Sequence, residues 1–72
     1  MNKYTVTIYI AGQGHEVGES VKTLEKAMSL ARILRHDFGL TKNACDVSEC
    51  GTGKVIARWR LLDGCWTAVV PS

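Results

Sequence analysis

The segment over residues 55–70 constrains the fold of this chain most, because it joins residue alternation to a turn signal. Two runs of alternating apolar residues meet at Asp63-Gly64, a dipeptide that suits a two-residue type I′ turn, in which both central residues have positive φ angles. A hairpin with this turn places Leu61 opposite Trp66. Trp59 and Trp66 then share the inner face of a sheet, so we expect both in the core.

Two further strands are predicted ahead of the helix. Residues 3–11 alternate between an apolar set that contains Val6 and Ile8 and a second set that contains Tyr9, and they are rich in β-branched and aromatic side chains. After a glycine-containing turn, residues 15–21 return as a second strand. Together these segments predict an opening hairpin.

A helix is expected between Thr23 and Gly39. The Thr23 hydroxyl is a good N-cap acceptor, and glycine is common directly after a helix end. At about 100° per residue, apolar side chains gather in one stripe, the pattern of a helix that packs on a sheet. The stripe contains Leu24, Ala27, Ala31, Leu34 and Phe38. Ile33 lies outside it.

Residues 44–50 predict a third strand, which pairs with the fourth through a loop over residues 51–53. A three-residue loop turns Cys45 toward the core. The same register sets Asp46 opposite Arg58, an attractive cross-strand pair. The third and fourth strands therefore form a second hairpin.

The predicted elements follow the order β-β-α-β-β-β over residues 1–72, without an internal repeat or a linker. This order favours a single compact α+β domain, in which an antiparallel four- to five-stranded sheet has one helix packed on one face. A chain of 72 residues buries only roughly 60% of its unfolded surface, which leaves little stability to support an elaborate active site.

Charge and composition limit the classes of partner and the compartment. The net charge is +2, and residues 22–43 carry five basic and two acidic residues. Proteins that bind nucleic acids usually have a strongly basic face or a pI above about 9, so this surplus is small for that class. Cys45, Cys50 and Cys65 form no CxxC pair and follow no signal-peptide pattern, so we expect reduced thiols in the cytoplasm. The apolar runs are too short to span a membrane.

The residue pattern contains no motif for catalysis, cofactor binding or metal binding. Residues 51–54, GTGK, are similar to the end of a phosphate-binding loop, but the leading glycine and the Mg²⁺-binding hydroxyl are missing, so a hairpin turn is favoured. The cysteines with His15 and His36 lack the closely spaced ligand pair typical of zinc sites. No nucleophile has a base at an interpretable spacing. We therefore expect no catalytic residue, cofactor or metal.

Two surfaces are candidates for binding a partner. Arg58 and Arg60 lie with Tyr9 on the uncovered face of the predicted sheet, where guanidinium and aromatic groups can bind acidic groups or stack on bases. The second surface lies near the C-terminal end of the helix and contains Arg32, Arg35 and Ile33. A solvated sheet face and a basic helix end that matches the helix dipole are the alternative interpretations of these residues.

The layout of the chain resembles that of several small phage and prophage α+β proteins, including compact anti-CRISPR inhibitors. This resemblance rests on an opening hairpin led by YTVTIYIAG, a TLEKAMSLARIL helix and a closing VIARWRLLDGCW hairpin. It implies a small inhibitor that acts in the host cytoplasm. The opening strand and the TLEKA helix start are also similar to the antitoxin half of HicAB-type pairs, but the extra strands expected before the helix are missing.

These observations predict a small non-enzymatic interaction protein that binds and blocks a host protein or nucleoprotein complex by steric and electrostatic contact. Arg and Tyr are enriched at binding hot spots, which favours the sheet face as the contact surface. The alternative is a small nucleic-acid-binding module that uses Arg58, Arg60 and the basic helix end on phosphates. A homodimer through an exposed edge strand is compatible with both hypotheses.

Overall fold

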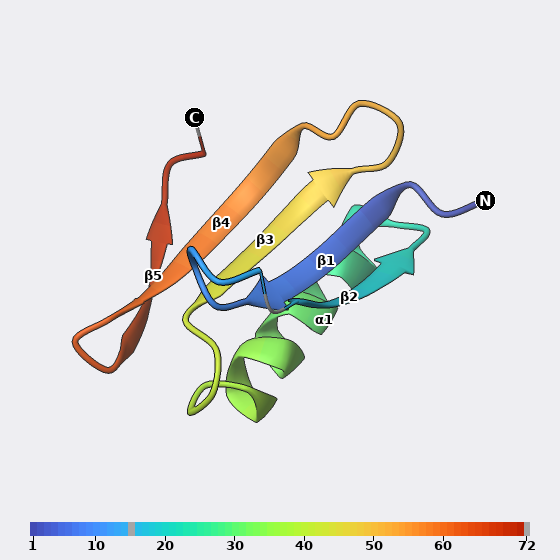
Figure 1. The fold of residues 1–72 in the computed structure, drawn as a ribbon. Coiled ribbons are helices and arrows are strands. Elements are labelled where there is room, and N and C mark those ends of the chain that lie inside the picture. Colours follow the sequence, from blue (N-terminus) through green and yellow to red (C-terminus); the bar gives the residue numbers. More distant parts are fainter. Residues whose placement is uncertain (15, 72) are drawn as a thin grey trace.

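The computed structural model describes residues 1–14 and 16–71, which form one helix and a five-stranded antiparallel sheet (Figure 1). The elements are β1 (Tyr4–Tyr9), β2 (Glu16–Val21), α1 (Leu24–Asp37), β3 (Ala44–Glu49), β4 (Val55–Leu62) and β5 (Cys65–Val69). The strand order across the sheet is β2-β1-β3-β4-β5. The predicted α+β class and the order of elements are confirmed. His15, which was expected to open the second strand, lies outside the described residues.

The core lies between α1 and the inner face of the sheet, where α1 packs over β1, β3 and β2 (Figure 1). Its fully buried members are Val6, Ile8, Ala27, Ala31, Cys45 and Val47. Because alanine has the smallest apolar side chain, Ala27 and Ala31 let the helix approach the strands closely. In the described part of the chain, no helix is long and apolar enough to cross a membrane.

Both ends of α1 lie where the sequence predicts them. The Thr23 hydroxyl oxygen accepts a hydrogen bond from the Lys26 amide at 3.1 Å, which confirms the N-cap. At the other end, Phe38 is the C-cap residue. A β-carbon on Gly39 would lie 2.8 Å from the carbonyl oxygen of Arg35, so a close backbone approach requires glycine at this position.

The closing hairpin has the predicted turn and register. Asp63 and Gly64 have φ angles of 51° and 79°, as a type I′ turn requires. Leu61 lies opposite Trp66, and Trp59 also lies on the inner face of the sheet. The local turn signal therefore sets the register of the β4–β5 pair.

The β3–β4 hairpin is confirmed in its central register and differs near its loop. Asp46 lies opposite Arg58, as predicted. Beyond Val47 the register shifts, because Ser48 pairs with Val55 and leaves Ile56 as the extra residue of a β-bulge. The connecting loop holds the four residues 50–53 and not three, since the residues that flank it, at positions 49 and 54, are joined by a backbone hydrogen bond of 2.9 Å.

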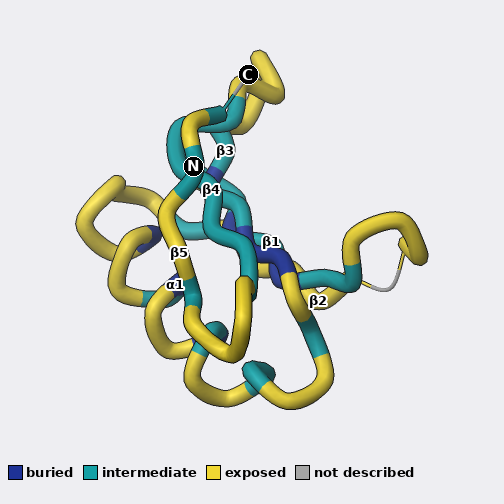
Figure 2. Tube along the Cα trace, turned by 90° about the vertical axis from the view of Figure 1, so that its left-hand side faces the viewer, coloured by how far each residue is buried: buried dark blue, intermediate teal, exposed yellow. Residues whose placement is uncertain are grey.

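The two tryptophans lie at the rim of the core and not at its centre. α1 is placed over β1, β3 and β2, so the β4–β5 hairpin extends beyond the area that the helix covers. Trp59 and Trp66 pack against the core cluster but are only partly buried. Figure 2 shows that β5 is mostly exposed. Both tryptophans were predicted to be buried in the core. This prediction is wrong, because each side chain is only partly buried and packs against the edge of the core.

The three thiols should differ sharply in reactivity. Cys45 is fully buried, and its desolvation raises the pKa of its thiol from 9.0 to about 11, whereas Cys50 and Cys65 are exposed. At about pH 8, Ellman's reagent should modify Cys50 and Cys65 rapidly and Cys45 only after unfolding. The thiolate is the reactive form, and burial with a raised pKa keeps the Cys45 thiol protonated and shielded from the reagent. A Cys50→Ser/Cys65→Ser variant should show no rapid reaction. Rapid modification of that variant under native conditions would contradict the burial of Cys45.

The same thiol makes stability depend on pH. The pKa of the Cys45 thiol is higher in the folded chain than in the unfolded chain. The stability that the protonated thiol contributes is therefore fully present below pH 9 and is lost as the pH rises toward about 11. We expect the free energy of unfolding, measured with urea, to fall over this range. A Cys45→Ala variant should show a smaller fall, because it has no thiol to titrate at this position.

Candidate functional site on the outer face of the sheet

The face of the sheet opposite α1 is open in the described structure (Figure 1). Four polar side chains on this face come from the adjacent strands β1, β3 and β4. In one row across the sheet, Asp46 of β3 lies opposite Arg58 of β4. In the next row, Tyr9 of β1 lies opposite Ala44 of β3, which lies opposite Arg60 of β4. Because neighbouring rows are close, the four polar side chains meet over β3.

Asp46 is the centre of this group, which we call the Asp46 network and which consists of Tyr9, Asp46, Arg58 and Arg60. Arg58 donates two hydrogen bonds to the carboxylate, from Nε to Oδ1 at 3.1 Å and from Nη2 to Oδ2 at 3.3 Å. The Tyr9 hydroxyl donates to Oδ2 at 2.9 Å. Arg60 Nη1 lies 3.5 Å from Oδ1, at the limit of a hydrogen bond. One carboxylate thus holds three side chains.

Arg60 is held by further contacts. Its Nη2 donates to the Tyr9 hydroxyl oxygen at 3.0 Å, and its Nη1 donates to the carbonyl oxygen of Trp59 at 3.0 Å. Its guanidinium carbon lies 5.5 Å from the centroid of the Tyr9 ring, within the range of a cation–π contact. Ala44, which lies between Tyr9 and Arg60 in the sheet, is fully buried. A small residue at this position leaves room for the two larger side chains to meet above it.

The network is partly desolvated and carries a surplus of positive charge. The side chain of Asp46 is 15% exposed, and those of Arg58 and Arg60 are 24% and 26% exposed. The hydrogen bond to Asp46 raises the pKa of Arg58. Burial raises the pKa of Tyr9, and its hydrogen bond to Asp46 raises it further. Two guanidinium groups and one carboxylate leave a net charge of +1.

The second predicted surface is divided between two faces of α1. Arg32 and Ile33 are exposed, with Ile33 at 55%, and they line a shallow hollow of about 400 Å³ on the outer face of the helix. Arg35 instead turns inward, and its guanidinium carbon lies 3.9 Å from the centroid of the Trp59 ring. Desolvation lowers the pKa of Arg35. The structure therefore separates Arg35 from Arg32 and Ile33.

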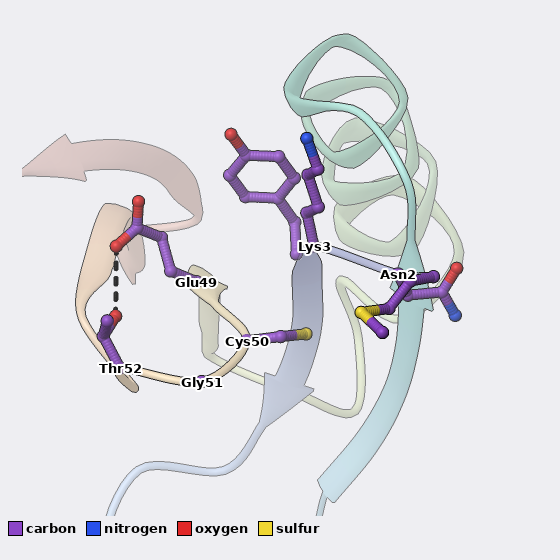
Figure 3. Close-up of a pocket in the computed structure, with 8 residues that line it drawn as sticks. Asn2, Lys3, Glu49, Cys50, Gly51 and Thr52 are labelled. Carbon is purple, nitrogen blue, oxygen red and sulfur yellow. Dashed lines mark hydrogen bonds between the residues drawn. The ribbon is translucent and has the colours of Figure 1, made fainter.

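A hollow of about 560 Å³ lies away from both surfaces, where the N-terminal residues meet the β3–β4 loop (Figure 3). Glu49 accepts a hydrogen bond from the Thr52 hydroxyl at 3.0 Å, and the Cys50 side chain points from the loop toward β1. The Cys50 sulfur lies 3.2 Å from the Thr5 hydroxyl oxygen. The GTGK segment is thus part of a hairpin loop, as predicted, and does not begin a helix.

Among the described residues, no group of three or more His, Cys, Asp or Glu side chains is placed to hold a metal ion. Comparison with known proteins identifies no relative of this chain. No family model, curated protein or solved structure matches the chain. The geometry of the surfaces is therefore the basis for proposing a function.

The Asp46 network brings together Tyr9, Arg58 and Arg60, which sequence reasoning proposed as one surface. Asp46 was expected only as a cross-strand partner of Arg58, and its contacts with Tyr9 and Arg60 were not predicted. These contacts depend on the pairing of β1 with β3, which brings together Tyr9 and Asp46, 37 positions apart in the sequence. Such a non-local pairing has no local motif in the sequence.

Proposed function

We propose that this protein is a small non-enzymatic interaction protein that binds an acidic surface of a partner protein through the Asp46 network. The observation that carries this proposal is the fixed orientation of Arg58 and Arg60 on an open sheet face. Side chains that are already ordered lose less conformational entropy when a partner binds. By analogy with the compact phage inhibitors that the layout resembles, the protein would act by covering the surface of its partner and so blocking it.

The chemistry of the network favours a carboxylate-bearing partner over nucleic acid. A guanidinium has five N–H donors in a planar fork, and Asp46 uses two of those of Arg58, so donors remain for a second acceptor. Binding to a nucleic acid backbone draws on several cations at once, and here a carboxylate at the centre reduces the charge of the group to +1. A surface with a net charge of +1 offers fewer cations than a nucleic acid backbone draws on, but it is sufficient to bind a single carboxylate.

The test is a pulldown from a host lysate with the wild-type chain and two charge-matched double variants. Arg58→Ala/Arg60→Ala removes both guanidinium groups, and Lys3→Ala/Lys54→Ala removes two exposed cations outside the network. Truncation of a single hot-spot residue costs at least about 2 kcal/mol, a ~30-fold loss of affinity, so we expect the double arginine variant to bind its partner at least ~30-fold more weakly than the wild type. The lysine variant should bind as the wild type does, and both folds should be verified by circular dichroism.

Nuclease treatment and salt separate the proposed function from the nucleic-acid alternative. A protein partner should survive nuclease, and its binding should depend only moderately on salt. A nucleic-acid partner would be lost after nuclease, and its affinity would fall linearly with salt on a log–log scale. The proposal is abandoned if the folded arginine variant keeps every partner, or if each captured partner disappears with nuclease.

A further inference from the structure

The two arginines of the Asp46 network differ in the N–H groups that their contacts within the chain leave over. Asp46 accepts from Nε and Nη2 of Arg58, at 3.1 and 3.3 Å, so it occupies the edge of the guanidinium between these two nitrogens. Because the guanidinium is planar, Nη1 lies at the corner opposite this edge and points away from Asp46. Nη1 and the second N–H of Nη2 form another edge with the fork geometry that suits a carboxylate.

This second edge of Arg58 can be reached from solvent. Within the described part of the chain, Nη1 of Arg35 is the one buried side-chain nitrogen or oxygen atom without a hydrogen-bond partner. Nη1 of Arg58 also has no partner there but is not buried, and the Arg58 side chain is 24% exposed. An acceptor from another molecule can therefore bind at this edge without displacing Asp46.

Arg60 instead lies against the sheet, with both of its terminal nitrogens engaged. Nη1 donates to the carbonyl oxygen of Trp59 and Nη2 to the Tyr9 hydroxyl oxygen, both at 3.0 Å. Nη1 also lies 3.5 Å from Oδ1 of Asp46. The nitrogen that these contacts leave over is Nε, which is attached to the aliphatic stem. A carboxylate would have to approach Arg60 beside its stem, whereas Arg58 offers the tip of its side chain.

The charges around the network favour an acidic group above β4. Glu16 of β2 lies opposite Tyr9 and is exposed, so its carboxylate repels a second one at that end of the row. On the other side of β4, Val69 lies opposite Arg58 and Thr67 lies opposite Arg60, and both are uncharged. A carboxylate that approaches over β5 therefore meets Arg58 without an acidic neighbour on that strand.

We propose that Arg58 is the residue that contacts the partner, by holding one Asp or Glu carboxylate of a partner protein through Nη1 and Nη2, while Arg60 stays bound within the network. This inference rests on the proposed function and refines it, because there the two arginines form one surface. One added carboxylate neutralises the net charge of +1 of the network. Lysine cannot replace Arg58 in this role, because an ammonium group has no planar pair of donors.

The test compares two variants that keep the net charge, Arg58→Lys and Arg60→Lys. The probe is acetyl-hexaglutamate amide, and acetyl-hexaglutamine amide is its uncharged control. Two hydrogen bonds between charged groups support a dissociation constant on the order of 1 mM for the wild-type chain. Arg58→Lys should weaken binding at least ~10-fold, and Arg60→Lys less than ~3-fold, because only the first removes the proposed fork. The fold of each variant is verified by circular dichroism.

A measurement on the wild-type chain does not depend on how the variants fold. The chain contains four arginines, and nuclear magnetic resonance with ¹⁵N-labelled arginine follows each guanidinium separately, after assignment through its own backbone. Addition of the glutamate peptide should move the Nη signals of Arg58, and those of Arg60 should move less.

The assignment to Arg58 is overturned by an equal or larger effect of Arg60→Lys, by larger shifts at Arg60, or by the absence of binding at about 20 mM peptide. It is also overturned if the glutamine peptide binds equally well, since the proposed contact is a charged one. None of these results decides the proposed function, which the pulldown with Arg58→Ala/Arg60→Ala tests separately. A double variant that keeps every partner would instead remove the network as a binding surface.

Discussion

Asp46→Ala should lower the free energy of unfolding by about 2 kcal/mol and weaken partner binding at the same time. The carboxylate accepts hydrogen bonds from Tyr9, Arg58 and Arg60, and hydrogen bonds to charged groups contribute about 1.5–3 kcal/mol each when buried. The two guanidinium groups are about a quarter exposed and can turn partly to water, so the loss is smaller than the sum. Without Asp46, Arg58 also loses the hydrogen bonds that fix its orientation, whereas Arg60 keeps its contacts with Tyr9 and Trp59.

The matched control is Asp63→Asn, which removes one negative charge at an exposed turn. Asparagine tolerates the positive φ angle of this position, so stability should change by no more than about 0.5 kcal/mol. Urea unfolding followed by tryptophan fluorescence gives both values. Equal stability of the two variants would show that the Asp46 network contributes nothing measurable to the fold.

The network can also be followed by titration of Tyr9. Burial and the hydrogen bond to Asp46 both raise the pKa of Tyr9, so Asp46→Ala should return it part of the way toward its ordinary value. Absorbance of the tyrosinate in a Tyr4→Phe background reports Tyr9 alone, because the chain has two tyrosines. An unchanged pKa would mean that the Tyr9–Asp46 hydrogen bond is not formed in solution.

Ile8→Ala should cause the largest loss of stability of any variant considered, about 3–4 kcal/mol. Ile8 is the largest fully buried side chain, and truncation of a buried isoleucine removes transfer free energy and leaves a cavity. A domain of this size has a total stability on the order of 4–11 kcal/mol, so the variant should unfold at a melting temperature about 15–25 °C lower.

Ile33→Ala is the control for this substitution, because it makes the same chemical change on the outer face of α1, where Ile33 is 55% exposed. Alanine favours the helix and little apolar surface is lost, so the change should stay within about 0.5 kcal/mol. Thermal and urea unfolding of both variants provide the measurement. Similar losses for the two variants would contradict the packing of α1 on β1.

The fold was predictable where short-range rules act. Thr23 as the N-cap and the Asp63-Gly64 turn depend on neighbouring residues, and both are confirmed. Asp46 opposite Arg58 follows from one hairpin register and is also confirmed. The four-residue β3–β4 loop and the bulge at Ile56 were not predicted, because glycine-rich loops of different length are compatible with the same alternation.

The sequence by itself determined which side chains share a face of each hairpin, because side-chain direction in a strand alternates with a period of two. Only the tertiary structure decided which hairpins lie side by side. The pairing of β1 with β3 places Tyr9 beside Asp46, and the position of α1 leaves Trp59 and Trp66 at the rim of the core. These outcomes depend on contacts between distant segments, whose free energy depends on the packing of the whole chain and not on any local motif.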